Sequence, residues 1–117
     1  LPAIALTNHA ALSTAVANDQ APVLVAAQQI VGYGRPGDVF LGISTSGNAQ
    51  NVLLAAATAK ALGLKTIGLT GQTGGKLREI CDCTITVPAA VTADVQELHL
   101  PVYHTLCAML EAKFFAC

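Results

Sequence analysis

Three consecutive hydroxyl side chains, Ser44, Thr45 and Ser46, stand between an apolar run and a long alanine-rich segment. That order predicts a strand, a hydroxyl-rich turn and a helix. A helix N-terminus carries unpaired N–H donors and a partial positive charge, so such a turn is suited to binding an anion such as phosphate. A simple helix cap by Asn48 behind a tight turn at Gly47 would explain those two residues, but not three hydroxyls in a row. Anion binding is therefore the favoured interpretation.

A histidine and a pair of cysteines offer further chemistry. An imidazole titrates near neutral pH, so His104 is suited to proton transfer. On the residues alone, a satisfied histidine on a buried helix face is the favoured interpretation. Cys81 and Cys83 form a Cys-x-Cys pair without a second pair, which is a weak metal signal. Buried free thiols of a cytosolic protein explain the four cysteines better.

Strands and helices alternate along the chain. Strands are predicted at residues 2–6, 39–43, 65–70 and 84–87, and helices at 22–31, 49–62, 76–81 and about 94–115, the last interrupted by Pro101. Residues 10–19 are expected to be loop with a helical turn. Alternation of this kind predicts a parallel sheet covered on both faces. In such a sheet, ligands bind beyond the carboxyl ends of the strands, where the three hydroxyls and Thr70–Gly71 are expected.

The composition limits the classes of function. The 117 residues make one domain, 53% hydrophobic and 11% charged, with a net charge of -1. Scattered basic residues argue against a nucleic-acid groove or an anionic-membrane surface. No apolar run reaches ~18 residues, and no secretion signal is visible, so a cytoplasmic location is expected. No Gly-x-Gly-x-x-Gly follows a strand, which argues against a dinucleotide site. A chain without an initiating Met is expected to be part of a longer one.

Four segments, in order, resemble the sugar isomerase (SIS) domain family, and within it the phosphoheptose isomerases. They are residues 37–48 (GDVFLGISTSGN), 69–76 (LTGQTGGK), 86–88 (TVP) and 96–104 (QELHLPVYH). The resemblance covers residues 2 to about 115. It implies a flavodoxin-like, three-layer parallel sheet, a homotetramer, bound zinc, and conversion of sedoheptulose 7-phosphate to a heptose 7-phosphate. The family's N-terminal helices, central strand and a His and Glu of its metal site have no counterpart here.

Seven residues match positions that have roles in the family. The substrate-binding positions are Ser44, Thr45, Ser46, Asn18, Asp19 and Gln96, and the metal positions are Gln96 and His104. The family uses the position of His104 for proton transfer, so the resemblance implies a catalytic role for this residue. For Glu97 and His99, a place on the helix surface or at an interface is preferred.

Several departures from the family pattern bear on these roles. Ala49 replaces a Ser near the phosphate, and one residue rather than two separates Asp94 from Gln96. Pro101 is expected to kink the last helix and to break a backbone hydrogen bond. Gln96 and His104 are about 12 Å apart along a straight helix, so one ion could join them only if the helix begins irregularly or two subunits combine. The alternative function is a non-catalytic SIS module that binds a sugar phosphate or acts as a protein adaptor.

Overall fold

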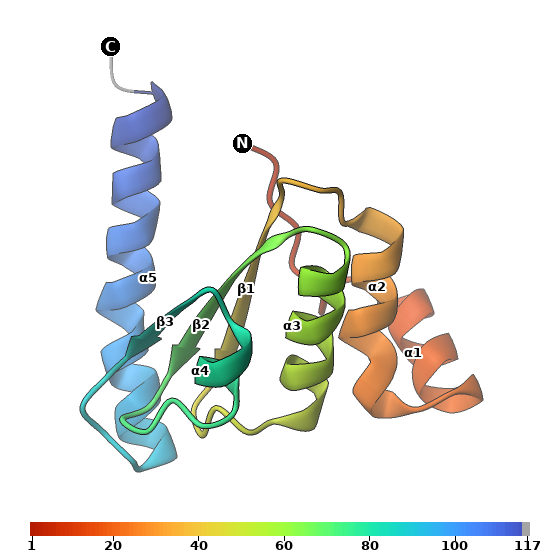
Figure 1. The fold of residues 1–117 in the computed structure, drawn as a ribbon, viewed down its shortest axis with the longest axis horizontal. Helices are drawn as coiled ribbons and strands as arrows, with labels where there is room; N and C mark the ends of the chain where they lie inside the picture. Colours follow the sequence, from red (N-terminus) through yellow and green to blue (C-terminus); the bar gives the residue numbers. More distant parts are fainter. Residues whose placement is uncertain (116–117) are drawn as a thin grey trace.

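The computed structural model describes residues 1–115, whose three strands form one parallel sheet. The strands are β1 (Val39–Ser44), β2 (Lys65–Thr70) and β3 (Cys83–Thr86), in the spatial order β1-β2-β3 (Figure 1). The predictions at 39–43, 65–70 and 84–87 are confirmed to within one residue at each end. All three strands run the same way, so their carboxyl ends meet at one edge of the sheet.

Helices lie on both faces of this sheet (Figure 1). They are α1 (Ala10–Asp19), the 3-10 turn η1 (Pro22–Leu24), α2 (Val25–Tyr33), α3 (Gln50–Ala61), α4 (Leu77–Ile80) and α5 (Thr92–Phe115). The helices predicted at 22–31, 49–62, 76–81 and 94–115 are confirmed in place, and the first of them begins as η1. The predicted α/β class with a parallel sheet is confirmed.

The two faces of the sheet are covered unequally. Phe40 points to the face where α3 packs and is buried, as is Ser44. On the opposite face, Ile85 of β3 lies with Val102 of α5, and α5 also contacts β2. The alternate side chains of β1 on that face lack such cover: Val39, Leu41 and Ile43 are 61%, 41% and 48% exposed. Helices thus cover both faces of the sheet around β2, whereas one face of β1 is bare.

The core lies between the sheet and helices α2, α3 and α4. It is a cluster of nine buried residues: Ile30, Phe40, Leu53, Ala55, Ala56, Ala59, Leu64, Leu77 and Cys81. Three of them are alanines of α3, whose small side chains let α2 and the sheet approach that helix closely. This packing holds the start of α3 at the carboxyl edge of β1.

The predicted strand at residues 2–6 is wrong. The segment is irregular, and Ile4 is 59% exposed. A strand needs a neighbouring strand for its N–H and C=O groups. Here the carbonyl oxygen of Leu6 instead accepts a 2.6 Å hydrogen bond from Nε2 of Gln29, and the Leu6 side chain packs against the core. A helix, not the sheet, therefore fixes the end of this segment.

The loop predicted at residues 10–19 is also wrong, because these residues form α1. The start of this helix is marked by His9, whose Nδ1 accepts a 3.2 Å hydrogen bond from the backbone N–H of Leu12. Histidine is not among the usual capping residues, so the sequence carries no ordinary start signal for this helix. Only Val16 of this helix is buried. Its alanine-rich composition favours a helix even without a broad apolar face.

The interruption predicted at Pro101 is wrong as well, since α5 is one helix from Thr92 to Phe115. Proline removes one N–H donor from the helix. The carbonyl that loses this donor belongs to Glu97, an exposed residue that water can reach. The Pro101 carbonyl accepts a 2.7 Å hydrogen bond from Oγ1 of Thr105. The helix therefore continues through the proline.

The cysteines of the described residues are free thiols. Cys81 lies in the core, and burial raises the pKa of its thiol. Cys83 and Cys107 are exposed, so the prediction that the thiols are buried holds for Cys81 alone, and Cys117 lies outside the described residues. No helix within residues 1–115 combines the length and apolar character needed to cross a membrane.

Candidate active site

The three hydroxyls lie at the carboxyl end of β1, as predicted. Ser44 is the last residue of the strand and is 6% exposed, Thr45 is half-buried, and Ser46 is exposed. The backbone turns sharply here, with the N–H of Gly47 donating a 3.0 Å hydrogen bond to the carbonyl of Ser44. The Ser44 hydroxyl oxygen accepts a long bond, 3.4 Å, from the N–H of Ala49. We call residues 44–48 the hydroxyl turn.

Asn48 does not cap α3, so the simple capping interpretation is wrong. The cap position is Ala49, and no side chain bonds to the first N–H groups of the helix. The Asn48 side chain instead forms hydrogen bonds with backbone groups outside the helix. Its Nδ2 donates to the Ser46 carbonyl at 3.1 Å, and its Oδ1 accepts from the backbone N–H of Lys76 at 3.0 Å. The donors at the start of α3 are therefore left for a ligand or water.

The glycine-rich loop after β2 packs directly against the hydroxyl turn. A Cβ at Gly75 would lie 2.5 Å from the carbonyl oxygen of Ser46, so only glycine allows this approach. The N–H of Leu77, at the start of α4, donates a 2.9 Å hydrogen bond to the carbonyl of Gly47. The shape of the hydroxyl turn is thus set by a second loop some thirty positions later in the sequence.

Helix α5 meets the same edge of the sheet through a buried histidine. His99 is 2% exposed, and its Nε2 lies 3.1 Å from the carbonyl oxygen of Thr70 at the end of β2. The preferred interpretation of His99 as a surface or interface residue is wrong for this residue, whereas Glu97 is exposed as expected. Val95 and His99 are four residues apart and both buried, and this helical spacing was the signal for the buried face.

The two predicted metal ligands lie on α5, and both are exposed. The ring of His104 meets the ring of Tyr103 edge to face, with centroids 5.2 Å apart and planes at 81°. Because α5 is helical from Thr92 onward, an irregular start does not shorten the distance of about 12 Å along the axis between Gln96 and His104. Bonds to zinc from nitrogen or oxygen are about 2 Å long, so these two side chains of one chain do not fit one tetrahedral ion. Within residues 1–115, no three His, Cys, Asp or Glu side chains cluster as a metal site would require.

Asn18 and Asp19 lie at the end of α1, away from the hydroxyl turn. Both are exposed, and Nδ2 of Asn18 is 3.4 Å from Oδ1 of Asp19. Among the elements of the described chain, α1 contacts α2 and η1 and none of the strands. The structure therefore brings the three hydroxyls and the start of α5 to one edge, and leaves Asn18 and Asp19 elsewhere.

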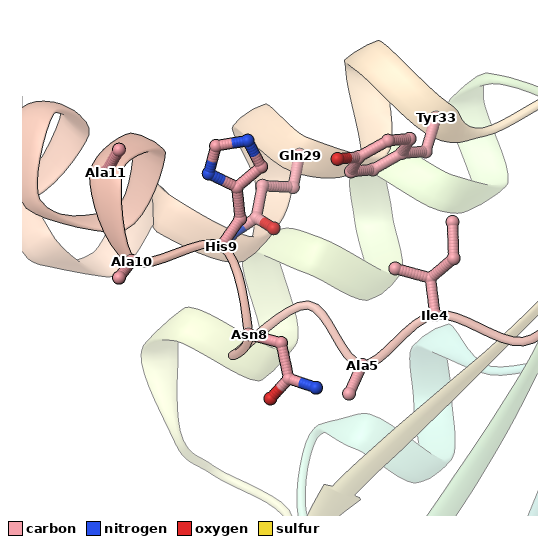
Figure 2. A pocket seen from close by; sticks show the side chains of 8 residues that line it. All are labelled: Ile4, Ala5, Asn8, His9, Ala10, Ala11, Gln29 and Tyr33. Carbon is pink, nitrogen blue, oxygen red and sulfur yellow. The ribbon is translucent and has the colours of Figure 1, made fainter.

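A hollow of about 490 Å³ lies between the irregular N-terminal segment and α2 (Figure 2). It contains none of the predicted site residues, and its walls are largely apolar: Ile4, Ala5, Asn8, His9, Ala10, Ala11, Gln29 and Tyr33. The Gln29 amide reaches into this region because its nitrogen binds the Leu6 carbonyl. The predicted site residues therefore lie outside this hollow, and the three hydroxyls are at the carboxyl edge of the sheet.

Comparison with known proteins identifies the class of domain that this edge belongs to. The sequence profile described as "SIS domain" matches residues 1–71, which include the hydroxyl turn. The chain belongs to the SIS domain family.

Several curated relatives of similar sequence are phosphoheptose isomerases. The phosphoheptose isomerase of Geotalea daltonii is 48% identical over 115 residues, and that of Nitratiruptor sp. is 46% identical over 114 residues. These alignments cover 98% and 97% of this chain but 60% and 61% of the relatives. The chain thus spans about three fifths of the length of the curated relatives it matches.

Solved structures agree with the sequence comparison. The phosphoheptose isomerase of Neisseria gonorrhoeae superposes with a TM-score of 0.90 at 39% identity, covering 93% of this chain and 62% of that one. That of Francisella tularensis gives 0.88 at 40% identity, covering 92% and 58%. The SIS fold and the similarity to phosphoheptose isomerases predicted from the sequence are confirmed.

Proposed function

We propose that the full-length protein is an aldose–ketose isomerase that converts sedoheptulose 7-phosphate to a heptose 7-phosphate. The names of the relatives support the substrate class. The observation that carries the proposal is the hydroxyl turn at the start of α3, a helix whose first N–H groups receive no side-chain cap.

The hydroxyl turn is the proposed phosphate site. Ser44, Thr45 and Ser46 offer hydroxyl donors, and the start of α3 adds backbone donors and a partial positive charge. Asn48 and Gly75 hold the turn from the other side, so its donors are arranged before a ligand arrives. Ala49 supplies no hydroxyl, and the backbone must serve in its place.

Isomerisation moves a proton between two adjacent carbons, and His104 is the proposed group that transfers it. The exposed imidazole is accessible to a substrate, and the edge-to-face contact with Tyr103 restrains its ring. Gln96 is proposed to contact the substrate, because the neighbouring Val95 packs beside Gly71 at the edge of the hydroxyl turn.

We propose that the active protein is a homo-oligomer, and specifically the homotetramer that the family resemblance implies. Apolar side chains of α5 are exposed along its outer half, including Met109, Leu110 and Phe114 at 62%, 48% and 55%. We also propose that Asn18 and Asp19 contact the substrate once such an assembly has formed. A cytoplasmic location is proposed on the free thiols of the described residues.

A zinc ion is proposed only as one that two chains share. Since Gln96 and His104 of one chain do not fit one ion, we propose that any shared ion takes them from two different chains, together with ligands outside residues 1–117. A bound zinc would supply a Lewis acid for the sugar carbonyl. Metal analysis of the purified full-length protein, before and after dialysis against a chelator, tests its presence.

The test of the function is turnover of sedoheptulose 7-phosphate by the full-length protein. We expect a heptose 7-phosphate to form and phosphate-free sedoheptulose to be a poor substrate, because the hydroxyl turn then has no anion to bind. Tight binding without turnover would contradict the enzyme and favour the non-catalytic SIS module.

A further inference from the structure

His99 is a buried side chain that the proposed reaction does not use. It is 2% exposed, and its Nε2 is 3.1 Å from the Thr70 carbonyl oxygen. A carbonyl oxygen only accepts hydrogen bonds, so Nε2 must carry the proton. The same oxygen accepts a 3.0 Å bond from the N–H of Val87, which fixes its direction.

The other end of the same peptide group reaches the hydroxyl turn. The N–H of Gly71 donates a 2.9 Å hydrogen bond to the carbonyl of Thr45. The Thr70 carbonyl and the Gly71 N–H belong to one planar unit, so turning one turns the other. Hydrogen bonds in such a series also polarise and strengthen one another. One peptide group therefore links His99 of α5 to Thr45.

The atoms packed around Gly71 leave the linking peptide group no room to move. A Cβ at Gly71 would lie 2.7 Å from the carbonyl oxygen of Thr45, 2.9 Å from that of Ala89, and 3.1 Å from Cγ2 of Val95. Val95 is fully buried and lies one helical turn before His99. Two side chains of α5 therefore dock on the Thr70–Gly71 peptide, one by packing and one by a hydrogen bond.

We propose that His99 is a positioning residue: through the Thr70–Gly71 peptide it fixes the start of α5, which carries Gln96, relative to the hydroxyl turn. This inference rests on the proposed isomerase function. A substrate held at its phosphate presents its reacting carbons at a set distance from the turn. Misplacement of a substrate-contacting group by about 1 Å can cost ~100-fold in rate. His99 sets that placement without touching the substrate.

Two substitutions separate the hydrogen bond from the bulk of the ring. His99→Gln keeps a donor at the end of a side chain of similar reach, and His99→Leu fills space without a donor. Leu53→Val, in the core, is the control for a general loss of stability.

Amide hydrogen exchange in the full-length protein tests the link without any assay of turnover. We expect protection of the Gly71 N–H to fall about tenfold in His99→Leu relative to the amides of α3, since the series of hydrogen bonds is opened. His99→Gln should retain that protection, and Leu53→Val should lower protection evenly. Equal protection of Gly71 in the wild-type protein and His99→Leu would overturn the proposed link.

Kinetics per folded molecule test the consequence. We expect kcat of His99→Leu to fall about tenfold or more with KM changed less than about threefold, because the phosphate site remains while the start of α5, with Gln96, is displaced. His99→Gln should recover most of kcat. Unchanged kcat in His99→Leu, or an equal loss in His99→Gln, would refute the positioning role. Absence of turnover in the wild-type protein would refute the proposed function and with it the catalytic consequence, while the exchange result still decides the link itself.

Discussion

A Cβ atom at Gly47 would lie 2.0 Å from the carbonyl oxygen of Gly74, which is closer than any real Cβ contact. The two residues come from the hydroxyl turn and from the loop after β2, and both have positive φ angles, 69° and 77°. The backbones of the two loops therefore touch directly, and a side chain at Gly47 would separate them.

Gly47→Ala should therefore lower stability and weaken phosphate binding together. We expect a loss of more than about 1 kcal/mol, because the left-handed conformation and the clash both oppose the methyl group. Gly32→Ala is the matched control: it lies within α2 with no atom near the added methyl, and it should gain about 0.5–1 kcal/mol. Urea unfolding of both variants measures the difference, and equal effects would contradict the contact.

Removing two hydroxyls of the turn should weaken sugar-phosphate binding. The double variant Ser44→Ala, Ser46→Ala should lose about tenfold or more in affinity, because a hydrogen bond to a charged group is worth about 1.5–3 kcal/mol. Thr58→Ala is the control, since it removes a hydroxyl from α3 that binds only the Leu54 carbonyl. Calorimetry on the full-length protein gives both affinities, and an unchanged affinity of the double variant would reject the assignment.

The elements that the sequence predicted well were those with strong local signals. Apolar runs identified β1 and β2, and the hydroxyls at the end of β1 lie where a parallel sheet places its ligands. Local signals were misleading where the partner is distant in sequence. Asn48 resembles a helix cap, yet its side-chain oxygen Oδ1 accepts a hydrogen bond from the backbone N–H of Lys76, 28 residues away.

His99 is a second residue whose environment is set by a partner distant in sequence. A polar residue two positions after Glu97 resembles a surface residue, and the docking of Val95 on Gly71 shows that the face with His99 is the buried one. The segment at 2–6 has the composition of a buried strand, but pairing needs a neighbour that its own residues cannot supply. Composition thus predicts which residues could be buried, and the contacts decide which are.

His104→Ala should reduce turnover about 100-fold or more if the imidazole acts as general acid or base. Its affinity for the sugar phosphate should change little, because the proposed phosphate site is the hydroxyl turn. Thr105→Ala, at the next position of α5, is the control for changes to this part of the helix. A His104→Ala enzyme with normal turnover would show that the residue is structural.

Asp82 should make stability depend on acid pH. Its Oδ2 accepts hydrogen bonds from the Thr66 backbone N–H at 2.9 Å and from the Thr66 hydroxyl at 3.0 Å, and these lower the pKa of the carboxyl group. A folded-state pKa below the unfolded value means that the stabilisation is present at neutral pH and is lost as pH falls through the lowered pKa. Asp82→Asn should therefore be less stable than the wild-type protein at pH 7, with the gap closing in acid. Parallel stability curves of the two proteins would contradict this.

A polypeptide of residues 1–117 alone should lack isomerase activity. Its β1 lies at the end of the sheet order, so one edge of this strand has no partner within residues 1–115. Val39, Leu41 and Ile43 of the same strand are exposed on the face that α5 leaves bare. An unpaired edge beside an apolar face favours pairing with another chain. The two proposed metal ligands, Gln96 and His104, are also too few for tight zinc binding, which usually takes three or four protein ligands. We therefore expect light scattering to show self-association, and an assay with sedoheptulose 7-phosphate to show no turnover. A monodisperse monomer with robust turnover would mean that residues 1–117 contain the whole site, and that the bare face of β1 requires no further cover.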